Sequence, residues 1–349
     1  MSRAARGELR GGVGASALAV MLGALRALTA LLALTTLTAL TALTVGCTGE
    51  PALSGLEEPF RVPAGTFREG DLPGSPPVAA GEATTSPRVT VVESVNNVLR
   101  PGQVGKSLHG RTTTDAVAVA LRFADLGTGH WVVPVGGPDP QAGGELTWTL
   151  ALDVAHDAPP GLHPLRVAAL DEAGNAGTQA EITTCVTGVV PDNLNACDPT
   201  IAPPRAVLSL AWTNDADLDL VLVTPSGKIV SPKQPTTAPP GENGTSPDLA
   251  TDGVFDLDAN AGCVRASTTR ENIVWQGPPE HGPYLVYVNL HAACGEPAAT
   301  FTVSLHLPTA REGGGEVLAE ALHVPGQVLA LHANGGAEIG LYVTAFAFQ

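Results

Sequence analysis

The sequence predicts an all-β protein with two tandem antiparallel β-sandwich domains. The chain has 349 residues, which is long enough for two domains of ordinary size. It contains 40 Gly and 30 Pro but only 15% charged residues, a composition that favours turn-rich β-structure over helix bundles. Short runs rich in β-branched residues alternate with turn residues along most of its length. We therefore expect many short strands and few helices.

The first 46 residues have the pattern of an export signal. Three arginines precede a long apolar run over residues 27–45, and they are Arg3, Arg6 and Arg10. A basic start, an apolar middle and small residues before a cleavage site are typical of such signals. The ending Gly46-Cys47 resembles a bacterial lipobox, which implies that Cys47 becomes the lipidated first residue of the mature chain. The alternative is a single transmembrane anchor, because about 20 apolar residues can span a bilayer.

Residues 1–46 are thus predicted to be a lipoprotein signal peptide, although Met21 would open a shorter signal of ordinary length. The start of translation is therefore open between Met1 and Met21. Residues 48–87 contain 7 Pro and 6 Gly and show no apolar periodicity. We predict a disordered Pro/Gly-rich tether over residues 47–87, which holds the folded part off the membrane.

The first domain is expected over residues 88–186. Its β-rich runs are Val89–Val92, Ala116–Phe123, Glu145–Leu152, Leu162–Leu170 and Gln179–Val186. The segment from Pro159 to Asn175 resembles the late hairpin of a bacterial immunoglobulin-like domain, which implies an immunoglobulin-like sandwich. Trp131 and Trp148 are interpreted as core or edge packing in preference to platforms for sugars.

Four cysteines remain once Cys47 is assigned to the lipid: Cys185, Cys197, Cys263 and Cys294. An even number in an exported protein predicts disulfides. Three pairings exist, and the local one, Cys185–Cys197 with Cys263–Cys294, fits the domain plan best. It makes residues 187–204 a disulfide-closed linker. The spacings of 12, 66 and 31 residues, without a Cys-x-x-Cys pair, argue against a zinc site.

The second domain is expected over residues 205–349. Its predicted strands are Val207–Trp212, Asp217–Thr224, Lys228–Ser231, Gly253–Leu257, Asn272–Trp275, Tyr284–Leu290, Thr300–Leu307, Glu316–His323, Gln327–His332 and Ile339–Phe348. Nine or ten short strands indicate a sandwich or jelly-roll architecture.

Four segments of this domain resemble, in order, the YfaP-like family of uncharacterised bacterial exported proteins: Asp215–Gly227, Gly253–Asp258, Glu271–Trp275 and Gly282–Val288. The resemblance covers residues 205–307. It implies a fold and a compartment, and it supports the Cys263–Cys294 bridge. It implies no reaction, because the family has none established.

An acidic cluster is the main candidate site of this domain. In an extended strand alternate side chains share a face, so Asp215, Asp217 and Asp219 are expected on one face, with Leu218, Leu220 and Leu222 on the other. Hard cations bind several oxygen ligands. The sequence therefore predicts a calcium site, with Asn260 as a carbonyl donor and five carboxylate candidates: Asp217, Asp219, Asp256, Asp258 and Glu271.

The alternative for these residues is structural. Asp215 and Asp217 would then cap a turn before the strand. Asp256 and Asp258 would accept hydrogen bonds from neighbouring backbone amides or from Arg265 and Arg270.

The composition also bounds the function. A net charge of −16 without a basic patch argues against nucleic-acid binding. The chain has no Gly-x-Ser-x-Gly and no His-Glu-x-x-His motif, so we expect no enzyme. The prediction is a lipid-anchored bacterial envelope protein, on the outer membrane or periplasmic face, whose β-domain binds or scaffolds a polysaccharide or an envelope protein. The alternative, a carbohydrate-binding or adhesive module, needs exposed aromatics, for which Trp275, Tyr284 and Tyr287 are the candidates.

Overall fold

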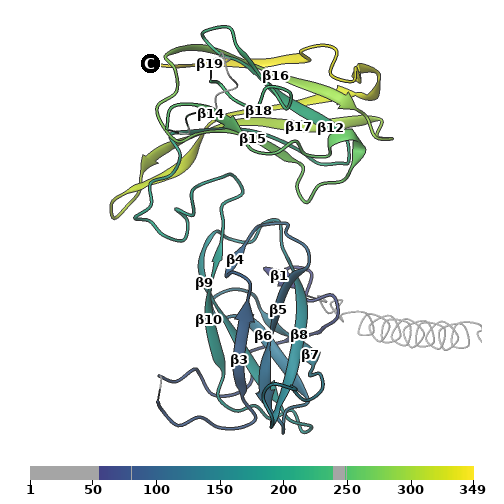
Figure 1. The fold of residues 1–349 in the computed structure, drawn as a ribbon, viewed down its shortest axis with the longest axis vertical. Coiled ribbons are helices and arrows are strands. Elements are labelled where there is room, and N and C mark those ends of the chain that lie inside the picture. The colour runs from purple at the N-terminus through teal and green to yellow at the C-terminus, as the bar shows by residue number, and fades with distance from the viewer. Residues whose placement is uncertain (1–54, 80, 239–247, 249) are drawn as a thin grey trace, which may run out of the picture. The chain divides into compact units, whose positions relative to one another are not determined.

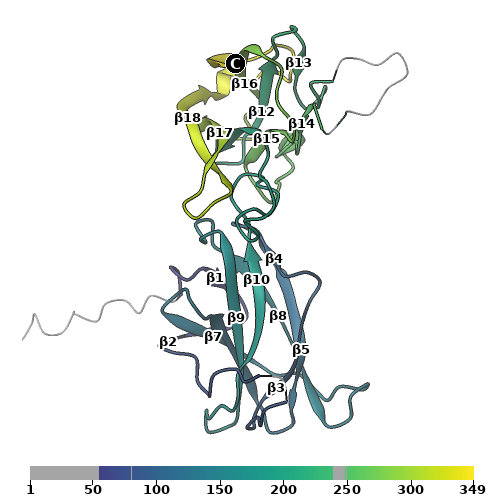
Figure 2. The same ribbon diagram turned by 90° about the vertical axis from the view of Figure 1, so that its left-hand side faces the viewer.

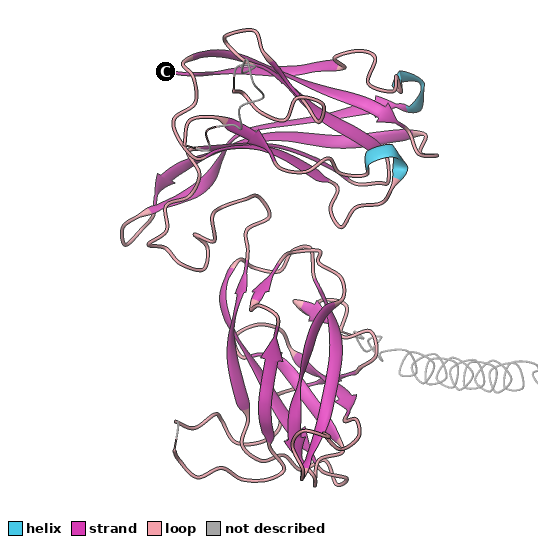
Figure 3. Cartoon of the chain, in the orientation of Figure 1, coloured by secondary structure: helices cyan, strands magenta, loops and turns pink. Residues whose placement is uncertain are grey.

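The computed structural model describes residues 55–79, 81–238, 248 and 250–349, which form two β-sandwiches (Figure 1). Figure 3 shows strands and loops throughout this part, with two short helical turns, η1 (Ala261–Cys263) and η2 (Ala330–His332). The all-β prediction is confirmed. Within the described residues, no helix is long and apolar enough to cross a membrane. The predicted signal peptide and Cys47 lie outside these residues.

The first sandwich consists of a four-stranded sheet, in the order β1-β8-β5-β3, and a six-stranded sheet, in the order β2-β7-β6-β9-β10-β4 (Figure 2). All neighbouring strands are antiparallel except β4 and β10. The strands are β1 (Phe60–Arg61), β2 (Thr66–Glu69), β3 (Val89–Ser94), β4 (Val98–Leu99), β5 (Lys106–Thr113), β6 (Ala118–Phe123), β7 (Gly129–Pro134), β8 (Glu145–Val154), β9 (Gly161–Leu170) and β10 (Ala180–Val186).

The core of the first sandwich contains both tryptophans, as the sequence predicts. Trp148 is 1% exposed and Trp131 is 7% exposed, and the Nε1–H of Trp131 donates to the carbonyl of Phe60 at 2.9 Å. The rings of Phe60 and Phe123 meet edge to face, with centroids 5.0 Å apart. Neither tryptophan is available as a sugar platform.

The predicted tether is wrong from Gly55 onward, because β1 and β2 belong to this sandwich. The side chains of Phe60 and Val62 are buried in its core, and Gln179 Nε2 donates to the carbonyl of Leu72 at 3.1 Å. The Pro- and Gly-rich composition prevented the prediction of these strands from the sequence, because it leaves no periodic pattern of apolar residues. A few apolar anchors nevertheless suffice to dock an extended chain on an existing core.

The second sandwich consists of a five-stranded sheet, in the order β14-β15-β11-β17-β18, and a four-stranded sheet, in the order β13-β12-β16-β19. All their strand pairs are antiparallel. The strands are β11 (Ala206–Trp212), β12 (Asp217–Val223), β13 (Ile229–Val230), β14 (Gly253–Phe255), β15 (Arg270–Trp275), β16 (Gly282–Ala292), β17 (Ala298–Ala310), β18 (Glu316–Leu329) and β19 (Leu341–Phe348).

The core of the second sandwich lies between its two sheets. The leucines of β12 enter this core, since Leu218, Leu220 and Leu222 are fully buried. Trp275 and Tyr284 are each 1% exposed and meet edge to face, with ring centroids 6.1 Å apart. The alternation of β12 therefore turns the intervening aspartates toward the outer face of the four-stranded sheet.

One long strand, β18, replaces the two strands predicted at Glu316–His323 and Gln327–His332. The dipeptide Pro325-Gly326 does not end the strand. Proline is tolerated because β18 is an edge strand and Pro325 need not donate to a neighbour. Gly326 is required because a Cβ there would lie 2.3 Å from the ring of Phe301.

Both predicted disulfides are present. Cys185–Cys197 closes the segment after β10, with an S–S distance of 2.04 Å. Cys263–Cys294 joins η1 to the residues just after β16, with an S–S distance of 2.09 Å. The local pairing derived from the domain plan is thus confirmed.

Candidate metal centre

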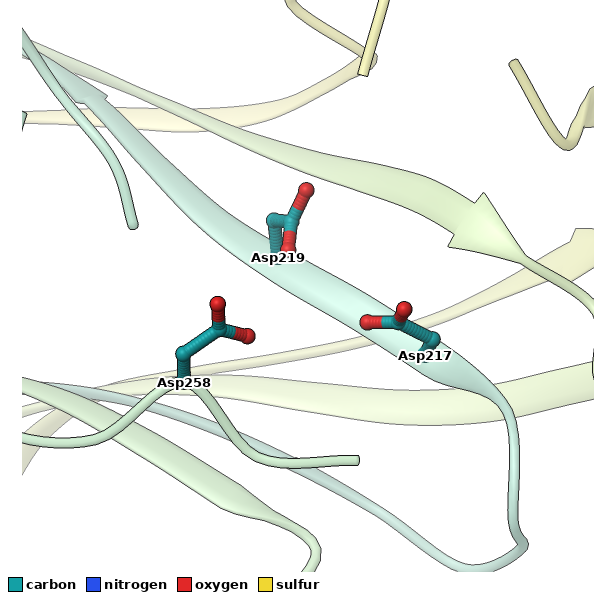
Figure 4. A group of neighbouring side chains, drawn as sticks. All are labelled: Asp217, Asp219 and Asp258. Carbon is teal, nitrogen blue, oxygen red and sulfur yellow. The ribbon is translucent and has the colours of Figure 1, made fainter. Parts of the chain in front are cut away.

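Three of the five predicted carboxylates converge on the outer face of the four-stranded sheet (Figure 4). Asp217 and Asp219 are alternate residues of β12, and Asp258 faces them from the loop between β14 and β15. One carboxylate oxygen of each residue lies within 4.8 Å of the corresponding oxygens of the other two. We call this group, with the space in front of it, the acidic pocket.

Local backbone geometry fixes the Asp258 loop against β12. The N–H of Gly262 donates to Asp217 Oδ2 at 2.8 Å. Asn260 has a φ of 62°, a left-handed conformation that asparagine adopts more readily than most residues. Its buried side chain donates to the carbonyl of Ala216 at 3.2 Å and accepts from the N–H of Ala266 at 2.9 Å. Both ends of the Asn260 side chain are thus held by the protein, and the side chain does not line the acidic pocket.

The burial of Asp217 and Asp219, together with the closeness of the exposed Asp258, makes the three carboxylates costly to ionise together. Asp217 is 1% exposed and Asp219 is 9% exposed. Burial raises the pKa of Asp219 to about 6, with a further increase from Asp217 and a partial offset from the hydrogen bond of Asn289. Burial also raises the pKa of Asp217 and of Asp258. At an effective dielectric constant of about 20, two carboxylates at this separation repel by roughly 3 kcal/mol.

Few positive groups offset this repulsion among the described residues. His291 Nδ1 lies 3.3 Å from Asp217 Oδ2, and this imidazole is about one-third exposed. Lys233 also lines the acidic pocket, but its Nζ donates to the carbonyl of Gly336 at 3.0 Å. Asp219 accepts a neutral hydrogen bond from Asn289 Nδ2 at 3.2 Å. A bound cation would supply the missing positive charge.

The acidic pocket has a volume of about 330 Å³ and is open to solvent on one side. The segments that carry the three carboxylates form one wall of the pocket, and the segment that joins η2 to β19 forms a second wall. Asn334 Nδ2 donates to Asn289 Oδ1 at 2.7 Å, and Asn334 Oδ1 accepts from the N–H of Gly336 at 2.8 Å. The lining also contains Glu338 and Ser231, together with the apolar side chains of Val221, Ile229 and Ile339.

Asp256 and Glu271, the other two predicted ligands, do not belong to the pocket. Asp256 accepts from the backbone N–H of Asn272 at 2.8 Å and from its Nδ2 at 2.7 Å. Glu271 is fully buried, and its carboxylate accepts from the backbone N–H groups of Leu220 and Ala259. For Asp256 the structural alternative is correct, because its carboxylate is hydrogen-bonded to Asn272 of β15. Glu271, for which only a role as calcium ligand was predicted, accepts backbone hydrogen bonds instead.

The predictions for two further polar residues, Asp215 and Arg270, have mixed outcomes. Asp215 forms an ion pair with Arg265 at the surface, so it takes no part in the pocket. Arg270 donates from Nη1 to Ser209 Oγ at 2.7 Å and pairs with no aspartate directly.

Asn289 and His291 also line the pocket, and neither was singled out from the sequence. Both are on β16, and the register pairs Asn289 with Asp219. The signal that would have found them is the alternation Asn289-x-His291, because it places two polar side chains on the same outer face as the aspartates.

The arrangement suits the coordination of a hard cation better than proton transfer. Calcium binds six to eight oxygens at about 2.3–2.6 Å, so ligands on opposite sides of the ion are roughly 5 Å apart. The three carboxylates satisfy this spacing. A nucleophile-base pair is not formed here. Among the described residues, the His–Asp pair with the shortest separation lies in the first sandwich and consists of His163 and Asp125. His163 Nδ1 contacts the Asp125 carboxylate and Nε2 contacts the carbonyl of Pro159, so neither ring nitrogen is free.

The comparisons with known proteins assign no family. No family model matches the chain, and no curated protein matches it. Among solved structures, one named "BspA_C_WT" is 10% identical and covers 66% of this chain and 94% of its own, with a TM-score of 0.19. The C-terminal domain of the Streptococcus agalactiae AgI/II polypeptide BspA is 11% identical over 70% of this chain and 82% of its own, with a TM-score of 0.16.

Dimeric latent PorU from Porphyromonas gingivalis is 11% identical and covers 72% of this chain and 31% of its own, with a TM-score of 0.19. Similarity at this level indicates no shared function. The resemblance to the YfaP-like family stays a prediction.

Proposed function

We propose that this protein is a non-catalytic binding protein of the bacterial cell envelope, lipid-anchored through Cys47, whose second sandwich binds calcium in the acidic pocket. The observation that supports this most directly is the convergence of Asp217, Asp219 and Asp258 in an open pocket with little positive charge around them. The two disulfides agree with an oxidising compartment. Bound calcium would order the two walls of the pocket and so present the surface around it.

The first test is a thermal melt of the oxidised mature protein with millimolar calcium and then with a chelator. A site filled at 100 times its dissociation constant adds about 2.7 kcal/mol to the free energy of unfolding. We expect calcium to raise the Tm and Asp219→Asn to abolish the increase. The matched control is Asp215→Asn, which removes a nearby aspartate outside the pocket and should retain the full calcium response. Coincident melting curves of the wild type with and without calcium would contradict the proposal.

A carbohydrate-binding module is the second candidate, and one observation favours it. Of the three aromatics that the sequence offered, Trp275 and Tyr284 are buried, but Tyr287 is on the outer face of the sheet, opposite Val221 of the pocket wall. Its ring meets that of Tyr342 edge to face at 5.6 Å, and Tyr342 is 53% exposed. Exposed aromatic rings beside polar groups are the usual means of stacking on a sugar.

Binding to insoluble polysaccharides, measured by sedimentation with and without calcium, tests this second candidate. We expect Tyr342→Ala to reduce the bound fraction at least fivefold. The control is Leu331→Ala, which truncates a 77% exposed apolar side chain on η2 and should leave binding unchanged. Equal losses in the two variants, or no retention of the wild type by any polysaccharide, would remove this candidate.

A further inference from the structure

Glu271 connects the two segments that carry the pocket carboxylates. Its Oε2 accepts from the N–H of Leu220 at 2.7 Å, and Leu220 follows Asp219 in β12. Its Oε1 accepts from the N–H of Ala259 at 3.1 Å, and Ala259 follows Asp258 in the loop. A single side chain thus bonds to the backbone immediately beside two of the three converging carboxylates.

The placement of Glu271 is unusual for a charged residue. It lies on the same side of β15 as Ile273 and Trp275, whose side chains form the apolar core, and it is 0% exposed. A buried carboxylate is costly unless it is hydrogen-bonded. The described residues give it two backbone donors, Leu220 and Ala259, and no basic side chain within ion-pair distance. Both of its bonds tie β15 to the elements of the pocket.

We propose that Glu271 is the positioning residue of the acidic pocket: its carboxylate clamps the Asp258 loop onto β12 and thereby sets the separation between Asp219 and Asp258. The clamp itself is a property of the protein without any ligand. Its consequence for cation affinity rests on the proposed function.

Asp256 provides a matched control within the same loop. Its carboxylate accepts the backbone N–H and the Nδ2–H of Asn272 in β15, and neither of these bonds reaches β12. Loss of the Asp256 bonds should weaken the loop without changing the pocket. A comparison of Glu271→Gln with Asp256→Asn therefore separates positioning from general loss of stability.

The experiment has two readouts. Amide hydrogen exchange, measured by NMR on cation-free protein, reports the clamp, and calcium titration calorimetry reports its consequence. Glutamine has one acceptor oxygen, and its NH₂ group would face the second N–H. In Glu271→Gln we expect the amide of Leu220 or Ala259 to exchange at least tenfold faster and calcium to bind at least tenfold more weakly. In Asp256→Asn we expect faster exchange at Asn272, with calcium affinity within twofold of the wild type.

Three outcomes overturn the proposal: unchanged exchange at Leu220 and Ala259 in Glu271→Gln, calcium affinity within twofold of the wild type in that variant, or an equal loss of affinity in Asp256→Asn. A wild type that binds no calcium refutes the proposed function instead, and hydrogen exchange then decides the clamp alone. If Glu271→Gln does not fold, Glu271→Asp is measured in the same way. It keeps the carboxyl group but shortens the reach by one methylene, so it should free one of the same two amides.

Discussion

Asp219 is buried beside two other carboxylates, those of Asp217 and Asp258. Its pKa rises from the ordinary value of 3.8 to about 6, chiefly because it is buried. An acid whose folded pKa exceeds its unfolded pKa binds its proton more tightly in the folded protein. Its contribution to stability is therefore present below about pH 4 and is lost as the pH rises through about 6. A bound cation would compete with this proton.

The pH dependence of unfolding without calcium tests this assignment. We expect the free energy of unfolding, from urea titrations in chelator, to fall between about pH 4 and pH 7, with Asp219 contributing up to roughly 3 kcal/mol. Asp219→Asn should remove that part of the slope. The control is Asp171→Asn. Side-chain and backbone hydrogen bonds from Asn175 lower the pKa of Asp171, so the contribution of Asp171 to stability rises with pH instead of falling. A slope in Asp219→Asn equal to that of the wild type would contradict the assignment.

The sequence predicted the pocket only in part, for reasons that are visible at single residues. The alternation of Asp217 and Asp219 with buried leucines can be read directly, because strand periodicity decides it. The roles of Asp256 and Glu271 could not be read, because they depend on which backbone amides the fold brings within reach of each carboxylate. A carboxylate in a sequence does not reveal whether its partner is a cation or an N–H group.

At the scale of elements, β5 shows why some strands escaped prediction. Its centre reads His109-Gly110-Arg111, and glycine within a strand ordinarily indicates a turn or a bulge. The structure supplies the reason for the glycine. A Cβ at Gly110 would lie 2.0 Å from the carbonyl of Val91 and 2.7 Å from the ring of Trp148. The residue that weakens the strand signal is thus the one that lets Trp148 pack across β5.

Gly110→Ala should therefore overpack the first sandwich. We expect it to reduce the free energy of unfolding by about 2–3 kcal/mol, because neither a backbone carbonyl nor a buried indole can move aside cheaply. Chemical denaturation followed by tryptophan fluorescence measures this loss. The matched control is Gly137→Ala, whose new Cβ would meet nothing within 4 Å. Equal stability of Gly110→Ala and the wild type would show that the packing around Trp148 is looser than described.

At the scale of the whole molecule, composition was sufficient to predict the class of the fold. Each sandwich has its own core, centred on Trp148 in the first and on Trp275 in the second. The division near residue 187 follows from cysteine spacing and strand rhythm. The position at which the first sandwich begins did not follow, because Phe60 and Val62 are two isolated apolar residues within a Pro- and Gly-rich stretch.

Membrane attachment is the prediction that belongs to the molecule as a whole. We expect the full chain, expressed in a bacterium that processes lipoproteins, to partition into the detergent phase of a Triton X-114 separation. Cys47→Ser removes the only residue proposed to carry lipid and should move the processed protein to the aqueous phase. Retention of that variant in the detergent phase, at the mass of the uncleaved chain, would indicate instead that residues 27–45 serve as a transmembrane anchor.

Under the proposed function, the Cys263–Cys294 bridge would impose an order on the assembly of the protein during its biosynthesis. It ties the turn that donates to Asp217 to the residues that follow His291, so it fastens one wall of the pocket to the sheet covalently. Thiols stay reduced where proteins are translated and oxidise after translocation. Under the proposed function, a newly made chain would thus reach its final affinity for calcium only outside the cytosol. Premature capture of the ion during synthesis would be disfavoured by chemistry already encoded in the chain.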